Sequence, residues 1–335
     1  MCDSVAVKSA EDSHQMTVKE KCKTDEEDKD LVDLGQFEFS VKDVLGEGAF
    51  GCVFKGRHKA SGQQVAVKEL PHDLLKENEV AVLQRTQNSD CLVQLVGVCS
   101  QKSFTFLIME LLDIDLNAHI EIDGPLQPHD LRVVLDCIAR GYEELHHQQV
   151  VHRDIKPQNI LLRYNPEGTE IVSAKITDFT LCKQEDEGMS NVAGTMLYMA
   201  PEVGACLIQS NAYDASVDMW SIGCVLYQCF TGECPFDERA LCKLFLSAAC
   251  ENYGAIKVPD LPDDSPESVR ILVHLLLQVD SRQRLTATEF FDMATDWARS
   301  HSKRQRKHWA IANEFWSHPV WSGPAQYTLA PPTPS

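Results

Sequence analysis

Residues 37–70 constrain the fold more strongly than any other stretch, because strand patterns lie on both sides of a glycine cluster. The segments FEFSVKDVLG, CVFKGRH and QQVAVKEL alternate apolar and polar residues, as half-buried strands do. Glycines at 46, 48 and 51 link the first two segments, and glycine lets a backbone approach a phosphate closely. A dinucleotide-binding fold needs a helix directly after its glycines. The strand that follows here excludes a Rossmann oxidoreductase and predicts a hairpin of an antiparallel sheet.

The pattern changes along the chain from strands to helices. A helical stretch is expected over residues 73–87, strand-like apolar runs return at 91–99 and 104–112, and the remainder is mostly helical. We therefore expect an α+β fold with two lobes. Residues 37–111 form a small antiparallel β-sheet with one helix, and residues 112–298 form a larger, mainly helical lobe.

Both ends of the chain are expected to be tails. Residues 1–36 are polar and acidic, which is typical of a disordered segment. Residues 299–335 are first basic, at 301–309, and then rich in proline and threonine. Tryptophans at 297, 309, 316 and 321 predict that part of this second region packs back on the domain.

The composition excludes some classes of function. A net charge of −19 argues against a nucleic-acid-binding surface. No apolar run approaches the roughly 20 residues of a bilayer-spanning helix, and no secretory signal is visible. The 13 cysteines form no CxxC pair, so free thiols in a reducing compartment are expected. We expect a cytoplasmic protein, with the basic run 301–309 leaving a nuclear location open.

A lysine and a glutamate in this first lobe are expected to pair. Lys68 closes the apolar strand VAVK, where a buried ammonium needs an anion. On the predicted helix, Glu79 falls in the same apolar stripe as Leu75, Val82 and Leu83. A glutamate in such a stripe needs a cation, so we pair Glu79 with Lys68.

The stretch HRDIKPQN, residues 152–159, resembles the catalytic loop of eukaryotic protein kinases of the serine/threonine type. The resemblance continues in KITDFT at 175–180, GTMLYMAPE at 194–202, DMWSIG at 218–223 and DSRQR at 280–284. These motifs occur in the family's order over most of the chain. They imply the bilobal protein kinase fold, a buried Asp218 that ties down the catalytic loop, and a salt bridge between Arg284 and Glu202.

The resemblance also implies a chemistry and its residues. Asp154 would accept the proton of a substrate hydroxyl, and Lys156 would contact the γ-phosphate, as in serine/threonine-directed members. Asn159 and Asp178 would hold a divalent metal ion. The implied cofactors are ATP and Mg²⁺, with Mn²⁺ as an alternative, and the implied partners are protein substrates. Nothing in the sequence indicates an oligomeric state.

The nucleotide site implied by the resemblance draws on both lobes. The ATP phosphates would lie under the glycine hairpin, and the adenine ring would lie between apolar side chains. The edge of the adenine would bond to the backbone that links the lobes. The implied residues are Gly46, Glu47, Gly48, Gly51, Val53, Ala66, Lys68, Met109, Glu110, Leu112, Asp115 and Leu161.

A regulatory switch is implied in the segment after Asp178. Arg153 and Lys183 stand where the family places two cations that bind a phosphorylated residue, and Ser190 is the best-placed hydroxyl. The acidic run 185–187 could supply the anion without modification, or it is simply a solvated loop.

Two departures from the family pattern stand out. Thr180 takes the place of the usual glycine of the Asp-Phe-Gly motif; it is interpreted as a tolerated substitution, with a slowed switch as the alternative. The turn-forming NPEG, 165–168, predicts a long hairpin resembling those of Roco-type and related kinases. Lys68, Asp154 and Asp178 are all present, which favours an active kinase over a pseudokinase that binds without chemistry.

Overall fold

The computed structural model describes residues 30–48, 51–75, 77–185, 189–190, 192–209, 212–254, 256–263 and 265–300. These residues form two compact units. Unit 1 comprises residues 30–87 and Gln94–Leu111, and unit 2 comprises Asn88–Val93 and residues 112–300. The predicted junction near residue 111 agrees with this division, apart from Asn88–Val93.

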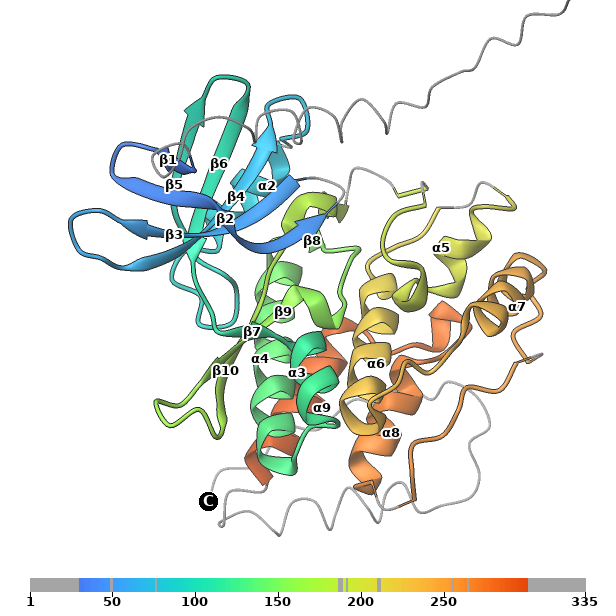
Figure 1. Ribbon diagram of the computed structural model, residues 1–335. Helices are drawn as coiled ribbons and strands as arrows, with labels where there is room; N and C mark the ends of the chain where they lie inside the picture. The colour runs from blue at the N-terminus through green and yellow to red at the C-terminus, as the bar shows by residue number, and fades with distance from the viewer. Residues whose placement is uncertain are drawn as a thin grey trace, which may run out of the picture. The chain divides into compact units, whose positions relative to one another are not determined.

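Unit 1 is built on one antiparallel sheet with the strand order β1-β2-β3-β4-β6-β5 (Figure 1). Its strands are β1 (Leu31–Asp33), β2 (Phe37–Gly48), β3 (Gly51–His58), β4 (Gln64–Pro71), β5 (Leu95–Gln101) and β6 (Phe104–Glu110). Helix α2 (Glu77–Arg85) follows β4, within the predicted helical stretch. The predicted sheet lobe with one helix is therefore confirmed.

Alternation along the strands produces the core of unit 1. Phe39, Phe54 and Phe106 are buried on one face of the sheet. The ring of Phe39 stacks on that of Phe54 at a centroid distance of 4.8 Å and lies 5.8 Å from that of Phe106. Three strands are joined in this way by aromatic contacts, which stabilise a sheet beyond the area that they bury.

The first boundary of the folded region differs from the expected one at residue 36. Leu31–Asp33 form strand β1 and pair with β2 in the register Leu31↔Ser40. Leu34, next along the chain, is buried in the core of the sheet. The acidic neighbours give this segment the composition of a tail, whereas its backbone bonds and one leucine place it in the sheet.

The predicted strand over 91–99 is also shorter than expected. β5 begins at Leu95, and the preceding Asn88–Val93 belongs to unit 2. Leu92 forms a parallel bridge with Ile176. The Ile176 amide donates to the Cys91 carbonyl at 2.9 Å, and the Val93 amide donates to the Ile176 carbonyl at 3.0 Å. The apolar run is thus divided between two different partners.

Unit 2 is mainly helical, as predicted. Helix α4 packs against α9 and strand β10, and α6 packs against α8 (Figure 1). The helices are α3 (Leu116–Asp123), α4 (Pro128–His147), α5 (Pro201–Ala205), α6 (Ser216–Thr231), α7 (Glu238–Ala249), α8 (Glu267–Leu276) and α9 (Ala287–Ser300). No helix in the described part of the chain has the length and apolar character of a membrane span.

Short strands carry the loops of unit 2. Strands β9 (Ile160–Tyr164) and β10 (Ile171–Ile176) form the predicted long hairpin, with β7 (Ile114–Asp115) beside β9. Strand β8 (Val150–Val151) pairs with β11 (Lys183–Gln184). These strands fix both ends of the segment that contains HRDIKPQN.

Trp297, on α9, is buried, as predicted for a tryptophan that packs on the domain. The other three tryptophans of that prediction lie outside the described residues.

Candidate active site

The predicted pair of Lys68 and Glu79 is present in unit 1. The Lys68 ammonium lies 2.7 Å from Glu79 Oε1, and both residues are buried. Lys68 is carried by β4 and Glu79 by α2, on the helix face that buries Val82 and Leu83. Each charge offsets the cost of burying the other, so strand and helix are linked electrostatically.

The glycine hairpin is formed by the ends of β2 and β3, where Gly46 pairs with Val53 and Gly48 with Gly51. Gly51 has a φ of +154°, and a Cβ there would lie 2.0 Å from the Glu69 carbonyl oxygen. Gly46, in contrast, has open space where a Cβ would project. Gly51 is therefore required by packing against β4, while Gly46 leaves the surface of the hairpin clear.

The other nucleotide residues implied in unit 1 lie on adjacent strands. Val53 of β3 pairs with Lys68 of β4, and Ala66 pairs with Met109 of β6. The Glu110 side chain accepts a bond from the Gln94 amide at 2.9 Å. Because the Glu110 carboxylate is already bonded within the protein, Glu110 would contact the nucleotide through its backbone.

The remaining nucleotide residues lie in unit 2. Leu112 is buried, and Leu161 of β9 pairs with Asp115 of β7. Asp115 caps helix α3 by accepting a bond from the Ala118 amide at 3.0 Å. The Asp115 carboxylate therefore has a structural role, whatever its part in nucleotide binding.

The catalytic-loop motif is held by a buried carboxylate of α6. Asp218 accepts bonds from the amides of His152 at 2.7 Å and Arg153 at 2.8 Å. Arg153 adopts a φ of +69°, a strained conformation that the two converging amides hold in place. Burial raises the pKa of Asp218, while the neighbouring His152 and these bonds oppose the rise.

A third donor to Asp218 comes from Tyr142, which sequence reasoning missed. Tyr142 lies on α4, is buried, and its hydroxyl donates to Asp218 Oδ2 at 3.0 Å. Burial and the adjacent Asp218 raise the phenol pKa well above its usual value. A tyrosine in the apolar stripe of a helix was the available signal, because a buried phenol needs a partner.

The Asp154 carboxylate lies at the centre of a set of hydrogen bonds. Lys156 donates to Oδ2 at 2.8 Å, and Thr195 donates to Oδ1 through its amide at 2.9 Å and its hydroxyl at 2.8 Å. The Lys156 ammonium also donates to the Thr195 hydroxyl at 2.8 Å. The carboxylate is thereby fixed in direction, as a group that orients and deprotonates a hydroxyl must be.

The two residues implied as metal ligands offer oxygen atoms. The Asn159 amide nitrogen donates to the Asp154 carbonyl at 2.8 Å, which turns the Asn159 side-chain oxygen away from that carbonyl. Asp178 provides a carboxylate, on a backbone with φ +63°. The described residues contain no cluster of three or more His, Cys, Asp or Glu ligands. A hard cation that keeps water and phosphate oxygens as its other ligands fits this set.

The residues after Asp178 form a 3₁₀ turn, Phe179–Leu181. The Phe179 ring packs edge-on against the His152 ring at a centroid distance of 5.6 Å. The Thr180 hydroxyl donates to Asp178 Oδ1 at 2.6 Å. The departure from glycine at position 180 thus brings a donor to a metal-ligand candidate.

The three predicted switch residues all belong to unit 2. Arg153 is buried, Lys183 of β11 pairs with Val151 of β8, and Ser190 is exposed. Gly194 has a φ of +104°, and a Cβ there would lie 2.5 Å from the Arg153 carbonyl oxygen. Of the acidic run, Glu185 is exposed, and Asp186 and Glu187 lie outside the described residues.

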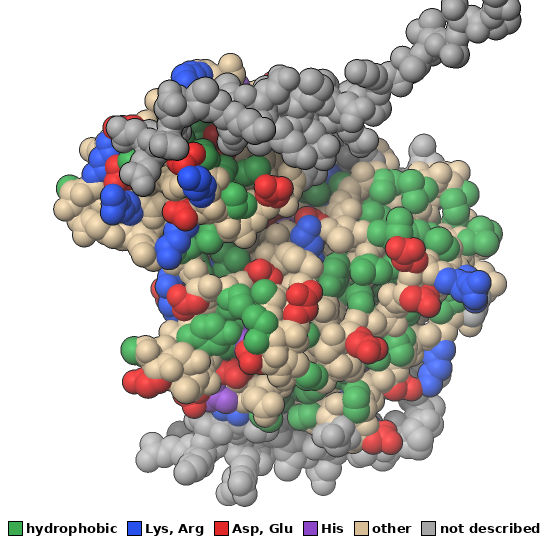
Figure 2. Space-filling model, in the orientation of Figure 1, with side chains coloured by type: hydrophobic (Ala, Val, Ile, Leu, Met, Phe, Trp, Pro, Cys, Tyr) green, Lys and Arg blue, Asp and Glu red, His purple; other side chains and the backbone are tan. Residues whose placement is uncertain are grey.

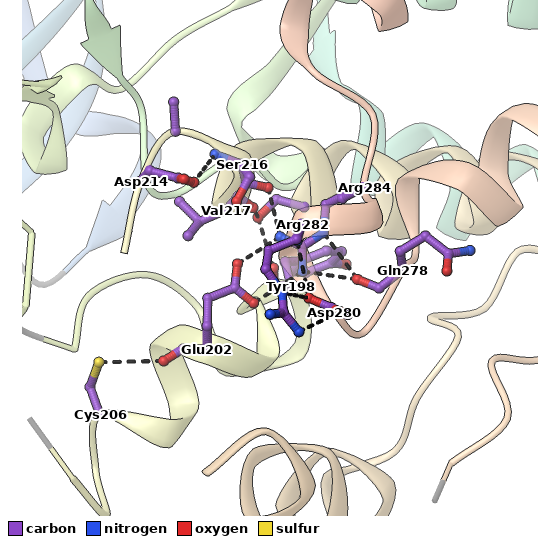
Figure 3. A network of polar contacts seen from close by, with 12 residues as sticks. Tyr198, Glu202, Cys206, Asp214, Ser216, Val217, Gln278, Asp280, Arg282 and Arg284 are labelled. Carbon is purple, nitrogen blue, oxygen red and sulfur yellow. Dashed lines mark hydrogen bonds and ion pairs between the residues drawn. The ribbon is translucent and has the colours of Figure 1, made fainter. Parts of the chain in front are cut away.

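Figure 3 shows the network that includes the predicted salt bridge between Arg284 and Glu202. Arg284 Nη1 and Nη2 lie 2.6 and 3.0 Å from the two Glu202 oxygens. The same guanidinium donates to the carbonyls of Ser216 and Gln278 and lies 5.3 Å from the Trp220 ring centroid. This network anchors the end of the GTMLYMAPE segment.

Comparison with known proteins extends these observations. The family model described as "Protein kinase domain" matches residues 39–296, well over half of the chain. Human "Serine/threonine-protein kinase ULK1" is 34% identical over 272 residues, 77% of this chain and 25% of that protein. Caenorhabditis elegans "Serine/threonine-protein kinase unc-51" is 31% identical over 273 residues, 76% of this chain and 31% of that protein.

A further relative is matched over most of its length. "Calcium/calmodulin-dependent protein kinase type 1" of C. elegans is 33% identical over 262 residues, 75% of this chain and 72% of that protein. The chain spans about a quarter to a third of the first two relatives. The suggested likeness to Roco-type kinases rests on the β9–β10 hairpin alone and stays a prediction.

Proposed function

We propose that this chain, which belongs to the protein kinase family, catalyses transfer of the γ-phosphate of ATP to serine and threonine hydroxyls of proteins. A protein kinase domain uses ATP and a divalent metal ion. The observation that carries the proposal is the fixed Asp154 carboxylate, on a loop anchored by Asp218. The serine/threonine kinases among its relatives support the same substrate class.

The residues of the chain divide the work of phosphoryl transfer. Asp154 accepts the proton of the attacking hydroxyl, and Lys156, which bonds to Asp154, carries positive charge next to it. Lys68, held by Glu79, provides a cation for the nucleotide phosphates. Thr195 holds the Asp154 carboxylate on its other oxygen. Catalysis in this family rests mainly on such positioning and charge stabilisation.

Asn159 and Asp178 would hold the metal ion, which supplies positive charge to the phosphate oxygens. We propose Mg²⁺ as the physiological ion, because an all-oxygen set completed by water and phosphate suits its coordination. Mn²⁺ takes similar ligands, so the proposal predicts activity with both Mg²⁺ and Mn²⁺. Activity with Ca²⁺ should be lower than with either ion.

A protein-contact surface and a cytoplasmic location are also part of the proposal. Apolar side chains gather on unit 2 around α5 and α7 (Figure 2). Leu207 and Ile208, which follow α5 in the chain, and Leu246 of α7 are exposed. Such a patch is typical of a surface that contacts other proteins.

The described cysteines are free thiols, which supports a cytoplasmic location.

Regulation by phosphorylation of Ser190 is part of the proposal. Ser190 is exposed, and a phosphate there would add about −1.5 to −2 charge, for which Arg153 and Lys183 are the proposed cations. Mass spectrometry of active preparations should find this phosphate, and Ser190→Ala should lose most activity. Full activity of Ser190→Ala, with loss on neutralising residues 185–187, would favour the acidic run as the anion.

The test of the catalytic proposal is Asp154→Asn with Asp263→Asn as control, since the Asp263 side chain is fully exposed. Transfer from radiolabelled ATP to a peptide array should fall by about 1,000-fold or more in Asp154→Asn, while ATP binding stays within a few-fold of the parent. A parent that binds ATP but labels no peptide would favour the pseudokinase alternative. Turnover of Asp154→Asn near that of the parent would remove Asp154 from its role.

A further inference from the structure

We infer that Thr180 is a positioning residue for Asp178: its hydroxyl holds the carboxylate in the orientation that binds the metal ion of the nucleotide complex. The inference rests on the proposed function, because it concerns the metal that accompanies ATP. It replaces the expectation from sequence that Thr180 is merely a tolerated substitution for glycine.

The first observation is the contact itself. The Thr180 hydroxyl donates to Asp178 Oδ1 at 2.6 Å. This length falls within the range of about 2.5–2.7 Å for hydroxyl bonds to ionised carboxylates, which are roughly twice as strong as neutral bonds. Thr180 is only 1% exposed, so water is excluded from its side chain and does not replace the bond readily.

The backbone on both sides of the contact is fixed. Asp178 has φ +63° and ψ +74°, and the turn Phe179–Leu181 follows directly. Phe179 is buried against the His152 ring, and the Cys182 amide closes the turn on the Phe179 carbonyl at 3.1 Å. A right-handed 3₁₀ turn is open to any residue, so the local conformation does not require glycine at 180.

The side chain of Thr180 suits this task. Threonine is branched at Cβ, which restricts its χ1 rotation and keeps the hydroxyl in place. With Oδ1 engaged, the orientation of the Asp178 carboxylate is set before a cation arrives. Groups that orient metal ligands in this way commonly change metal affinity about 10- to 100-fold when they are removed. A glycine at this position would supply no side-chain donor.

The experiment compares the full chain with Thr180→Val, Thr180→Ser and Thr180→Gly. Thermal unfolding midpoints are measured with fixed ADP and increasing MgCl₂, and the Mg²⁺ concentration that gives half of the full shift is recorded. Thr180→Val keeps the branched shape without the hydroxyl, and this concentration should rise about tenfold. Thr180→Gly should behave in the same way, whereas Thr180→Ser, which keeps the hydroxyl, should stay within about threefold of the parent.

Thr295→Val is the matched control. Thr295 is also buried, and its hydroxyl donates to the Phe291 carbonyl on α9 at 2.8 Å. Its removal tests the general effect of losing a buried threonine hydroxyl, and the half-shift Mg²⁺ concentration should equal that of the parent.

The outcomes separate this inference from the proposed function. A parent with no Mg²⁺-dependent shift would overturn the nucleotide proposal and this inference with it. A parent with a clear shift, but with Thr180→Val and Thr180→Gly within twofold of it, would overturn only the inference. If Thr180→Val fails to fold, Thr180→Gly alone decides, because it introduces the residue that the family motif carries at this position.

Discussion

Two ion pairs of nearly equal length, one in each unit, are built in different ways. Lys68 and Glu79 are 2.7 Å apart in unit 1, and Arg284 and Glu202 are 2.6 Å apart in unit 2. The Arg284 side chain is fully buried, and its guanidinium also bonds to the carbonyls of Ser216 and Gln278. Lys68 instead brings a compact ammonium on a flexible stem.

The difference indicates different roles. A planar guanidinium that contacts both carboxylate oxygens fixes direction as well as distance, and suits a permanent structural link. An ammonium can turn towards a second anion, such as a phosphate, without leaving its pocket. We therefore regard the Arg284 pair as part of the framework and the Lys68 pair as part of the chemistry.

The largest effect on stability should come from Arg284→Ala. It removes a fully buried guanidinium that bonds to Glu202 and to two backbone carbonyls, and the free energy of unfolding should fall by about 3–5 kcal/mol. Urea denaturation followed by circular dichroism measures the change. A loss below about 1 kcal/mol would mean that the network is not a framework element.

Tyr142→Phe should have the next largest effect, because it removes one donor from the anchor Asp218. Hydrogen bonds to charged groups contribute about 1.5–3 kcal/mol, and the phenyl ring keeps the packing. The Tyr142 bond lowers the pKa of Asp218, so its loss should raise that pKa further. Since the loop needs the ionised carboxylate as acceptor, the acidic limb of the kcat profile should move to higher pH. An unchanged profile would limit Tyr142 to packing.

Glu79→Gln should affect activity far more than stability. The Gln amide keeps an oxygen that accepts a bond from Lys68, so the buried ammonium is not left without an acceptor, and the unfolding free energy should fall by only about 1 kcal/mol. The value of kcat/KM for ATP should fall at least about tenfold, because the cation is no longer held in place. A loss of stability equal to that of Arg284→Ala would break the contrast between the two pairs.

The smallest effect is expected for Arg282→Gln, two residues from Arg284. Arg282 also contacts both oxygens of a carboxylate, Asp280, at 2.8 and 2.9 Å, but its side chain is 76% exposed. The bond from Arg282 lowers the pKa of Asp280 from 3.8. Stability from this pair is therefore present above pH 3.8 and lost as pH falls through the lower, folded pKa.

For Arg282→Gln, the urea midpoint should be slightly lower than that of the parent at neutral pH and equal to it well below pH 3.8. A midpoint shift as large as that of Arg284→Ala would show that the geometry of an ion pair, and not its burial, determines its contribution to stability.

The helix pattern and the family resemblance predicted the residues that meet in charged pairs. Lys68 and Glu79 could be paired in advance because Glu79 falls in the apolar stripe of the predicted helix, and the pairing of Arg284 with Glu202 was implied by the family resemblance. Tyr142 and Thr180 could not be assigned in this way. The Tyr142 hydroxyl reaches Asp218 because α4 lies next to α6, and the Thr180 hydroxyl reaches Asp178 through a local turn. The periodicity of the sequence predicts neither contact.

Strand boundaries were predicted less well, for a related reason. Leu31–Asp33 have the composition of an acidic tail, and their strand state depends on pairing with residues 38–40. Cys91–Val93 have the pattern of a strand in the first sheet but bond to Ile176 instead. Both outcomes depend on partners that a local pattern does not identify.

The placement of Asn88–Val93 in unit 2 has a consequence for any attempt to divide this protein. The chain passes between the units after residues 87, 93 and 111, so no single cut yields either unit whole. A fragment that began at residue 112 would leave both backbone groups of Ile176 without their partners, at an edge that α4 covers. Dissection, circular permutation or exchange of lobes between relatives must therefore carry this six-residue insert with the helical part, or the recombined chain will lack the segment that bonds to the Ile176 backbone.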